Sequence, residues 1–254
     1  FQHLRKAGGT NFCTLAEANF KKEQLPPYFC MPDYHWPHLP SEKQEACAGC
    51  LHHWTNHEIT SFMKHHRIAG NEWDSFDVEH HFDLPAIFVT SFRKPVDRAL
   101  SQFRFECVEE RGCKIKNVDE WWKNRRDLYN IYTWTFSDVS RLKRISIDDK
   151  FAKERGVVLG TALDTISKFH LVLVMEWLQY AESAVQTVLG FSDTSALQQK
   201  VRPHNYVQRQ DTWSAEQFLD TSEYQEFRKY LALDEILTDA ARRFFLERLV
   251  CNEP

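Results

Sequence analysis

The sequence lacks the patterns that define several large classes of protein. Only 8 Gly and 9 Pro occur in 254 residues, which excludes collagen-like, repeat and low-complexity chains. There is no basic excess, since 32 Lys and Arg stand against 36 Asp and Glu, so a long nucleic acid is a poor candidate for a partner. No apolar run approaches the roughly 18 to 20 residues that a membrane-spanning helix needs, and no signal peptide is recognisable.

The composition that remains suits one folded domain over residues 1–254. Hydrophobic residues make up 43% and aromatic residues 14%, which is enough for a core, and the length fits a single α/β domain. Because the chain begins at Phe1, directly before its strongest motif, we expect it to be a trimmed piece of a longer protein. A membrane anchor outside this piece is therefore compatible with the sequence.

Short apolar runs are followed by a turn and a helical pattern at three places along the chain. The expected strands are residues 1–4, 85–90 and 170–175, and the helices after them are 10–20, 95–108 and 177–189. This alternation is typical of a central parallel sheet flanked by helices, an α/β fold. Further helices are expected at 118–136, 162–169 and 233–249, and a long irregular insertion at about 26–56.

The segment Lys6-Ala7-Gly8-Gly9-Thr10-Asn11 lies between the first strand and the first helix. Two glycines let the backbone approach an anion closely, and the helix start offers free N–H groups and the positive end of its dipole. Lys6 adds a charge that can stabilise a leaving phosphate oxygen, and Thr10 can cap the helix. The order is not that of a Walker A loop, in which Gly precedes Lys and Ser or Thr follows it. The segment predicts a phosphate cradle, with a tight turn carrying an incidental Lys as the alternative.

A second candidate phosphate contact follows the second strand. Arg93 lies at the strand end, and Ser101 comes eight residues later on the next helix, with Arg98 between them. An Arg and a hydroxyl in this arrangement can converge on one phosphate, to which the guanidinium makes a bidentate contact. Two phosphate contacts on neighbouring strand–helix units fit a ligand that carries both a 5′ and a 3′ phosphate.

These two segments resemble the motifs of a known family. Lys6–Asn11 resembles the 5′-phosphosulfate loop of the Golgi-type carbohydrate sulfotransferases, and Phe92–Phe103 is similar to their 3′-phosphate segment. The heparan sulfate 2-O- and 6-O-sulfotransferases and the galactose 3-O-sulfotransferases share these patterns. Weaker likeness follows in the family's order at 168–191, 202–205 and 233–249. The resemblance implies a three-layer, P-loop-NTPase-like sulfotransferase fold and the donor 3′-phosphoadenosine 5′-phosphosulfate (PAPS), which leaves PAP as product.

The family's motifs assign roles by position. The 5′-phosphosulfate would be held by Arg5, Lys6, Ala7, Gly8, Gly9, Thr10 and Asn11, and the 3′-phosphate by Arg93 and Ser101. A loop that closes over the nucleotide would contain Arg202, Pro203 and His204. The chain departs from the family at Arg5, Ala7 and Lys94, where Pro, Thr and Asp are usual, so the identity of the acceptor does not transfer.

Sulfuryl transfer resembles phosphoryl transfer in geometry, so positioning and electrostatics carry most of the catalysis and no metal is expected. Lys6 is the candidate that stabilises the leaving group. The base should be a His or Glu near the acceptor. The heparan 2-O enzymes place a His in a short G-H-x segment between the two phosphate motifs, and His57 fits that pattern best. The alternatives for the base are His53, Glu58, His80 and His81.

The seven cysteines allow more than one interpretation. Cys107 and Cys113 flank a short charged loop, which suits a disulfide in an oxidising compartment, with free thiols as the alternative. Cys47 and Cys50, followed by His52, have a spacing that could hold zinc. A second ligand pair is not evident there, so a disulfide or free thiols are favoured over zinc.

The expected reaction moves a sulfuryl group from PAPS to a hydroxyl. The family favours an acceptor on a carbohydrate, whereas the aromatic-rich insertion and the acidic balance leave a small molecule or a tyrosine open. Two further functions compete with this one: a nucleotide kinase, and a PAP- or partner-binding domain that has lost catalysis. The family implies the Golgi lumen or another part of the secretory pathway, with the cytoplasm left open.

Overall fold

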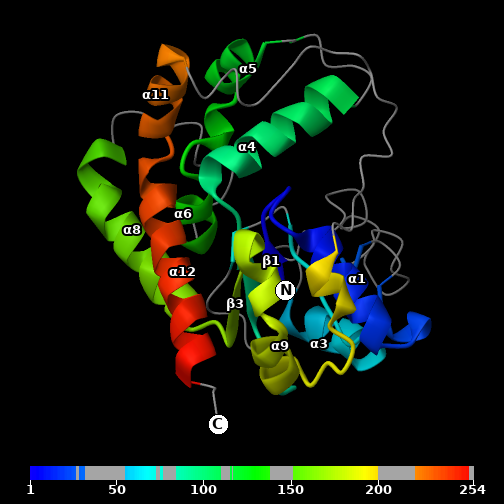
Figure 1. Cartoon of the computed structure of the whole chain (residues 1–254). Helices are drawn as coiled ribbons and strands as arrows, with labels where there is room; N and C mark the ends of the chain where they lie inside the picture. Colours follow the sequence, from blue (N-terminus) through cyan, green and yellow to red (C-terminus); the bar gives the residue numbers. More distant parts are fainter. Residues whose placement is uncertain are drawn as a thin grey trace.

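The structure of the chain is a computed structural model (Figure 1). The residues that it describes are 1–26, 29–31, 55–72, 75–76, 84–109, 115, 117–137, 151–199 and 221–251. All structural statements below concern these residues. Among the helices of these ranges, none combines the length and the apolar content that crossing a bilayer requires.

A small parallel sheet lies at the centre of the molecule. Its strands are β1 (Gln2–His3), β2 (Val89–Phe92) and β3 (Leu171–Val174), in the order β1-β2-β3. Thr90 of β2 is in register with both Gln2 and Val172. Every residue of the three strands is buried, as expected for strands covered on both faces. The predicted parallel α/β architecture is therefore confirmed.

Helices cover both faces of this sheet (Figure 1). On one face, α1 (Gly9–Asn19) and α9 (Glu182–Leu189) pack on the sheet through an apolar core that includes Leu15, Leu173 and Val185. On the other face, α8 (Phe151–Ser167) and α12 (Ala232–Cys251) lie side by side, and a second core includes Ile166, Val172 and Leu237. Leu173 and Val172 point to opposite faces because side chains alternate along a strand.

A third apolar cluster lies beyond the carboxyl ends of the strands. It joins α4 (Pro95–Phe103), α5 (Val118–Asn124) and α11 (Ser222–Lys229), which Figure 1 shows at the top of the view. Pro95 begins α4, as expected for a residue that needs no N–H in the first turn. The helix predicted to reach residue 108 ends as α-helix at Phe103 and continues as a π-helix, η2 (Arg104–Glu109).

The predicted helix at 118–136 is wrong, because the chain turns twice within it. The segment forms α5, a short 3-10 helix η3 (Arg126–Leu128) and α6 (Ile131–Phe136). Asn130 has a left-handed φ of 47°, so the chain changes direction there, between η3 and α6. Its side chain accepts from the backbone N–H groups of Leu233 and Asp234, while Asp234 accepts from those of Tyr132 and Thr133. The starts of α6 and α12 therefore cap one another.

The second strand also lies later than predicted. It runs over Val89–Phe92, and Ile87 within the predicted strand is half exposed. The reason is the partner strand, because β3 begins at Leu171 and pairs that residue with Val89. The remaining elements are α3 (Asn56–His65), η1 (Lys22–Gln24), η4 (Met175–Tyr180) and η5 (Ser195–Gln198). Gly190 ends α9 with a φ of 68°, as predicted.

Candidate anion-binding site

The loop between β1 and α1 presents the start of a helix without a side-chain cap. Lys6 and Gly8 have left-handed φ values of 68° and 101°, and Gly8 is the residue that precedes α1. No side chain of the described residues caps this end, and the first turn contains no acidic residue. The predicted cap by Thr10 is therefore wrong, since Thr10 lies inside the first turn. The N–H groups of the first turn have no partner within the helix, and such a helix start binds anions.

Close packing explains why two glycines occur here. A Cβ on Gly8 would lie 2.2 Å from Met175 Sδ, and one on Gly9 would lie 2.1 Å from His3 Nε2. Both distances are well inside van der Waals contact. The backbone of the loop therefore lies directly on the ends of β1 and β3, with no space for a side chain at either position.

The carboxyl end of β2 contacts the same loop. Arg93 Nη1 donates to the Lys6 carbonyl at 3.3 Å, and the Ser91 hydroxyl donates to the Ala7 carbonyl. The Arg93 N–H donates to the Tyr132 hydroxyl oxygen at 2.9 Å, and burial raises the pKa of that tyrosine, so it remains neutral. The structure thus brings Arg93 into contact with the loop of Lys6, a contact that the sequence did not predict. Ser91 and Tyr132 were not predicted, because nothing local marks them.

A buried guanidinium lies behind this contact. Arg98 is 1% exposed and donates through Nη1 to the Arg5 carbonyl at 3.3 Å and to Gln102 Oε1 at 2.7 Å. Its Nη2 has no hydrogen-bond partner among the described residues. Burial lowers the pKa of Arg98, since desolvation disfavours the charged form. Ser101 is half buried three residues further along α4, on the same face of the helix.

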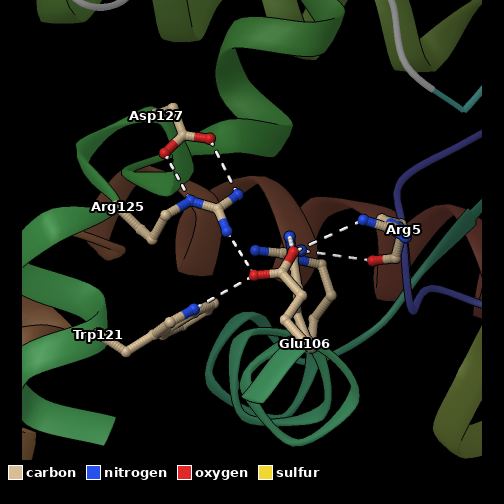
Figure 2. Close-up of polar contacts among 7 residues, drawn as sticks. Arg5, Glu106, Trp121, Arg125 and Asp127 are labelled. Atoms are coloured by element: carbon tan, nitrogen blue, oxygen red, sulfur yellow. Dashed lines mark hydrogen bonds and ion pairs between the residues drawn. The ribbon is translucent and has the colours of Figure 1, made fainter. Parts of the chain in front are cut away.

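Charged side chains converge next to the loop, as Figure 2 shows. Glu106 in η2 pairs with Arg5 at 3.6 Å and with Arg125, and it accepts from Trp121 Nε1 at 3.2 Å. Arg125 also pairs with Asp127 at 2.9 Å. The residue before Glu106 is Phe105, whose ring centre lies 4.4 Å from Lys6 Nζ, a cation–π contact. The π-helix therefore holds both Arg5 and Lys6 from one side, and π-helical turns occur frequently at functional sites.

A cavity of about 290 Å³ opens beside these charges. Its lining has an apolar part, which includes Leu4 and Ile131, and a charged part. The charged residues that line it are Arg5, Glu72, Glu106, Arg125 and Asp127. Among the described residues of the lining, three carboxylates stand against two guanidinium groups, so these residues give no excess of positive charge. A small uncharged or cationic group is therefore the better match to this cavity than a polyanion.

The structure adds Glu72 and His3 to the candidate site. Glu72 lines the cavity, and its Oε1 lies 3.4 Å from the Nε2 of the buried His3. Sequence reasoning missed both residues. The sequence feature that could have indicated Glu72 is the segment Gly70-Asn71-Glu72, which contains a glycine and lies between the two phosphate motifs.

The predicted base His57 lies elsewhere. It is exposed in the first turn of α3, whose start is capped by Thr55 and Glu58. Figure 1 shows α3 below the sheet in the view and α4 above it. Four other predicted site residues, His53, Arg202, Pro203 and His204, lie outside the described residues, as do His80 and His81.

The described cysteines include one complete disulfide. Cys13 of α1 is bonded to Cys30, which was not predicted. Cys107 is also disulfide-bonded, whereas Cys113, its predicted partner, lies outside the described residues. Cys47 and Cys50, the candidate zinc ligands, lie outside them too. Cys251 is free and exposed.

Comparisons with models of protein families, with curated protein sequences and with solved structures found no match for this chain. What the protein does is therefore inferred from the loop, the end of β2 and the cavity described above.

Proposed function

We propose that the chain is a PAPS-dependent sulfotransferase with the three-layer, P-loop-NTPase-like fold of that class. One observation carries the proposal: Arg93, from the second phosphate motif, donates to the carbonyl of Lys6 in the first. Two phosphate contacts on neighbouring strand–helix units suit a nucleotide with separate 5′ and 3′ phosphates. The order of Lys6 and the glycines argues against a kinase loop.

The residues present fit such a donor. The start of α1, which no side chain of the described residues caps, offers backbone N–H groups to a phosphate. Arg93 and Ser101 would hold the 3′-phosphate. In the same region, Nη2 of the buried Arg98 has no hydrogen-bond partner among the described residues.

The proposed roles follow from electrostatics. Lys6 and the amides at the start of α1 would stabilise the negative charge that builds on the leaving phosphate. Lys6 would leave its contact with Phe105 to do so, and a cation–π contact at a solvated site contributes about 0.5–1 kcal/mol. The acceptor, on a carbohydrate by resemblance, would enter from the cavity beside Arg5. Its hydroxyl needs a base, for which the sequence predicts His57.

The experiment that tests this function is nucleotide binding by titration calorimetry. PAP should bind without a metal ion, and Lys6→Ala and Arg93→Ala should weaken it. Losing a hydrogen bond to a charged group costs about 1.5–3 kcal/mol, which corresponds to about 10- to 150-fold in Kd. Lys229→Ala and Arg243→Ala, which remove exposed charges from α11 and α12, are the matched controls and should bind like the wild type.

Each competing function has its own outcome. Binding of ADP with Mg²⁺ but not of PAP would indicate a nucleotide kinase and overturn the proposal. Binding of PAP without any turnover of PAPS would indicate a domain that has lost catalysis. Equal affinity for PAP in the wild type and in both site variants would show that Lys6 and Arg93 do not bind the phosphates of the nucleotide.

A further inference from the structure

Glu72 lies at the carboxyl edge of the sheet, next to the candidate donor loop. Asn71 pairs with Gln2 in a parallel bridge, so the chain before Glu72 runs alongside β1. The His3 N–H donates to the Asn71 carbonyl at 2.9 Å, and the Asn71 side chain donates to Gln2 Oε1 at 2.7 Å. Parallel neighbours end at the same edge, where open α/β sheets bind their ligands. Glu72 therefore emerges at the edge that also carries Lys6.

His3 connects Glu72 to the start of α1. Its ring is 4% exposed, stacks on Phe1 with ring centres 4.8 Å apart, and packs so closely on Gly9 that no Cβ fits between them. Its Nε2 faces Glu72, while its Nδ1 has no hydrogen-bond partner among the described residues. The carboxylate is thus held by a ring that cannot move freely.

Glu72 is also accessible from the cavity. Its side chain is 16% exposed, and it lines the space of about 290 Å³ together with Arg5, the residue that precedes Lys6. An acceptor in this cavity would lie against both Glu72 and Arg5, and Arg5 directly precedes Lys6 of the loop that is proposed to hold the donor. His57 has no comparable position, since it is exposed on α3 and does not line this cavity.

We infer that Glu72, positioned by His3, is the general base of the reaction and that the cavity it lines receives the acceptor, an inference that rests on the proposed sulfotransferase function. Glu72 takes the proton of the acceptor hydroxyl as the acceptor oxygen bonds to sulfur. The bond from sulfur to the bridging phosphate oxygen breaks, and its electron pair stays on PAP, next to Lys6. Glu72 then releases the proton to solvent. The charge of the cavity selects an uncharged or cationic acceptor.

The test compares Glu72→Gln and Glu72→Ala with the control Glu17→Gln, which changes an exposed carboxylate on α1. Both Glu72 variants should lose about 10²- to 10⁴-fold in kcat, the range for a general base, and Glu72→Gln should lose the acid limb of the pH profile of kcat. Formate should restore part of the activity of Glu72→Ala and none of that of Glu72→Gln, because only the shorter side chain leaves space for a carboxylate. PAP affinity and the unfolding temperature should stay at the wild-type values in all three.

His3 is tested as a positioning residue. His3→Phe keeps a ring against Phe1 but removes the nitrogen that faces Glu72, so kcat should fall while the PAP affinity is retained. If His3→Phe does not fold, His3→Gln allows the same comparison of kcat with PAP affinity. An unchanged kcat in a folded His3 variant would show that His3 does not position Glu72 for the reaction.

The failures of the two proposals are distinguishable. A wild-type protein that neither binds PAP nor consumes PAPS would overturn the sulfotransferase function itself. A wild-type protein that does both, with full kcat in Glu72→Gln, would overturn only the role of Glu72. The role of Glu72 is also overturned if His57→Gln loses kcat while Glu72→Gln keeps it. Heavily sulfated acceptors that react faster than uncharged ones would overturn the charge selection assigned to the cavity.

Discussion

Gly9→Ala is the substitution whose cost follows most directly from the packing of the loop. A Cβ at this position would lie 2.1 Å from His3 Nε2 and 2.7 and 2.8 Å from two ring carbons. The ring cannot withdraw, because it is buried against Phe1 and faces Glu72. Such overpacking costs about 1–3 kcal/mol, while Ala in place of a helical Gly regains about 0.5–1 kcal/mol. We therefore expect a net loss of up to about 2.5 kcal/mol in the free energy of unfolding.

Gly160→Ala is the matched control. Gly160 lies in α8, and a Cβ there would have no neighbour within 4 Å. The same substitution should therefore stabilise the protein by about 0.5–1 kcal/mol. Urea unfolding with linear extrapolation measures both values, and PAP titration of Gly9→Ala should also show weaker binding. A stability gain in Gly9→Ala equal to that in Gly160→Ala would refute the close packing of the loop on His3.

Two further predictions concern stability. Burial raises the pKa of Asp234 to about 6 from an ordinary 3.8, so the folded state disfavours its ionised form and loses stability as the pH rises from about 4 to 6. Relative to Asp234→Asn, which cannot ionise, the wild type should lose up to about 1.4 kcal/mol of unfolding free energy per pH unit in that window. Urea unfolding at several pH values measures this difference. Unfolding free energies that change equally with pH in the two proteins would contradict the prediction. Replacing Cys13 and Cys30 with Ser should cost about 3 kcal/mol, from a link between residues 17 apart. Cys251→Ser is its control, and equal urea midpoints for the two would show that the link does not stabilise the fold.

The fold was predictable where the information is local. The strands around Thr90 and Val172 are short apolar runs, and a buried parallel strand needs little else. The segment 118–136 was not predictable in the same way. Its apolar positions suit one helix, and the break at Asn130 is fixed by contacts with Leu233 and Asp234, about a hundred residues away in the chain.

The candidate site was also predictable only where its residues are neighbours in the sequence. The loop around Lys6 and Gly8 is contiguous in sequence, so its geometry, and the phosphate cradle proposed for it, follow from a few neighbouring residues. Glu72 was missed because its position depends on a pairing between Asn71 and Gln2, which periodicity does not reveal. His57 was chosen for its residue type and for its place between the two motifs. The structure describes it as an exposed residue of α3, and its role stays a prediction.

Transfer of the sulfuryl group itself is the most direct test of the central claim. The wild type should be incubated with PAPS and a panel of neutral glycans, sulfated glycans, small phenols and amines, and the products followed by mass spectrometry. A sulfated product that forms with the wild type, together with an equal amount of PAP, and that is lost in Lys6→Ala, is the expected result. No product from any acceptor, with no affinity for PAP and stabilisation by ADP with Mg²⁺ alone, would contradict it.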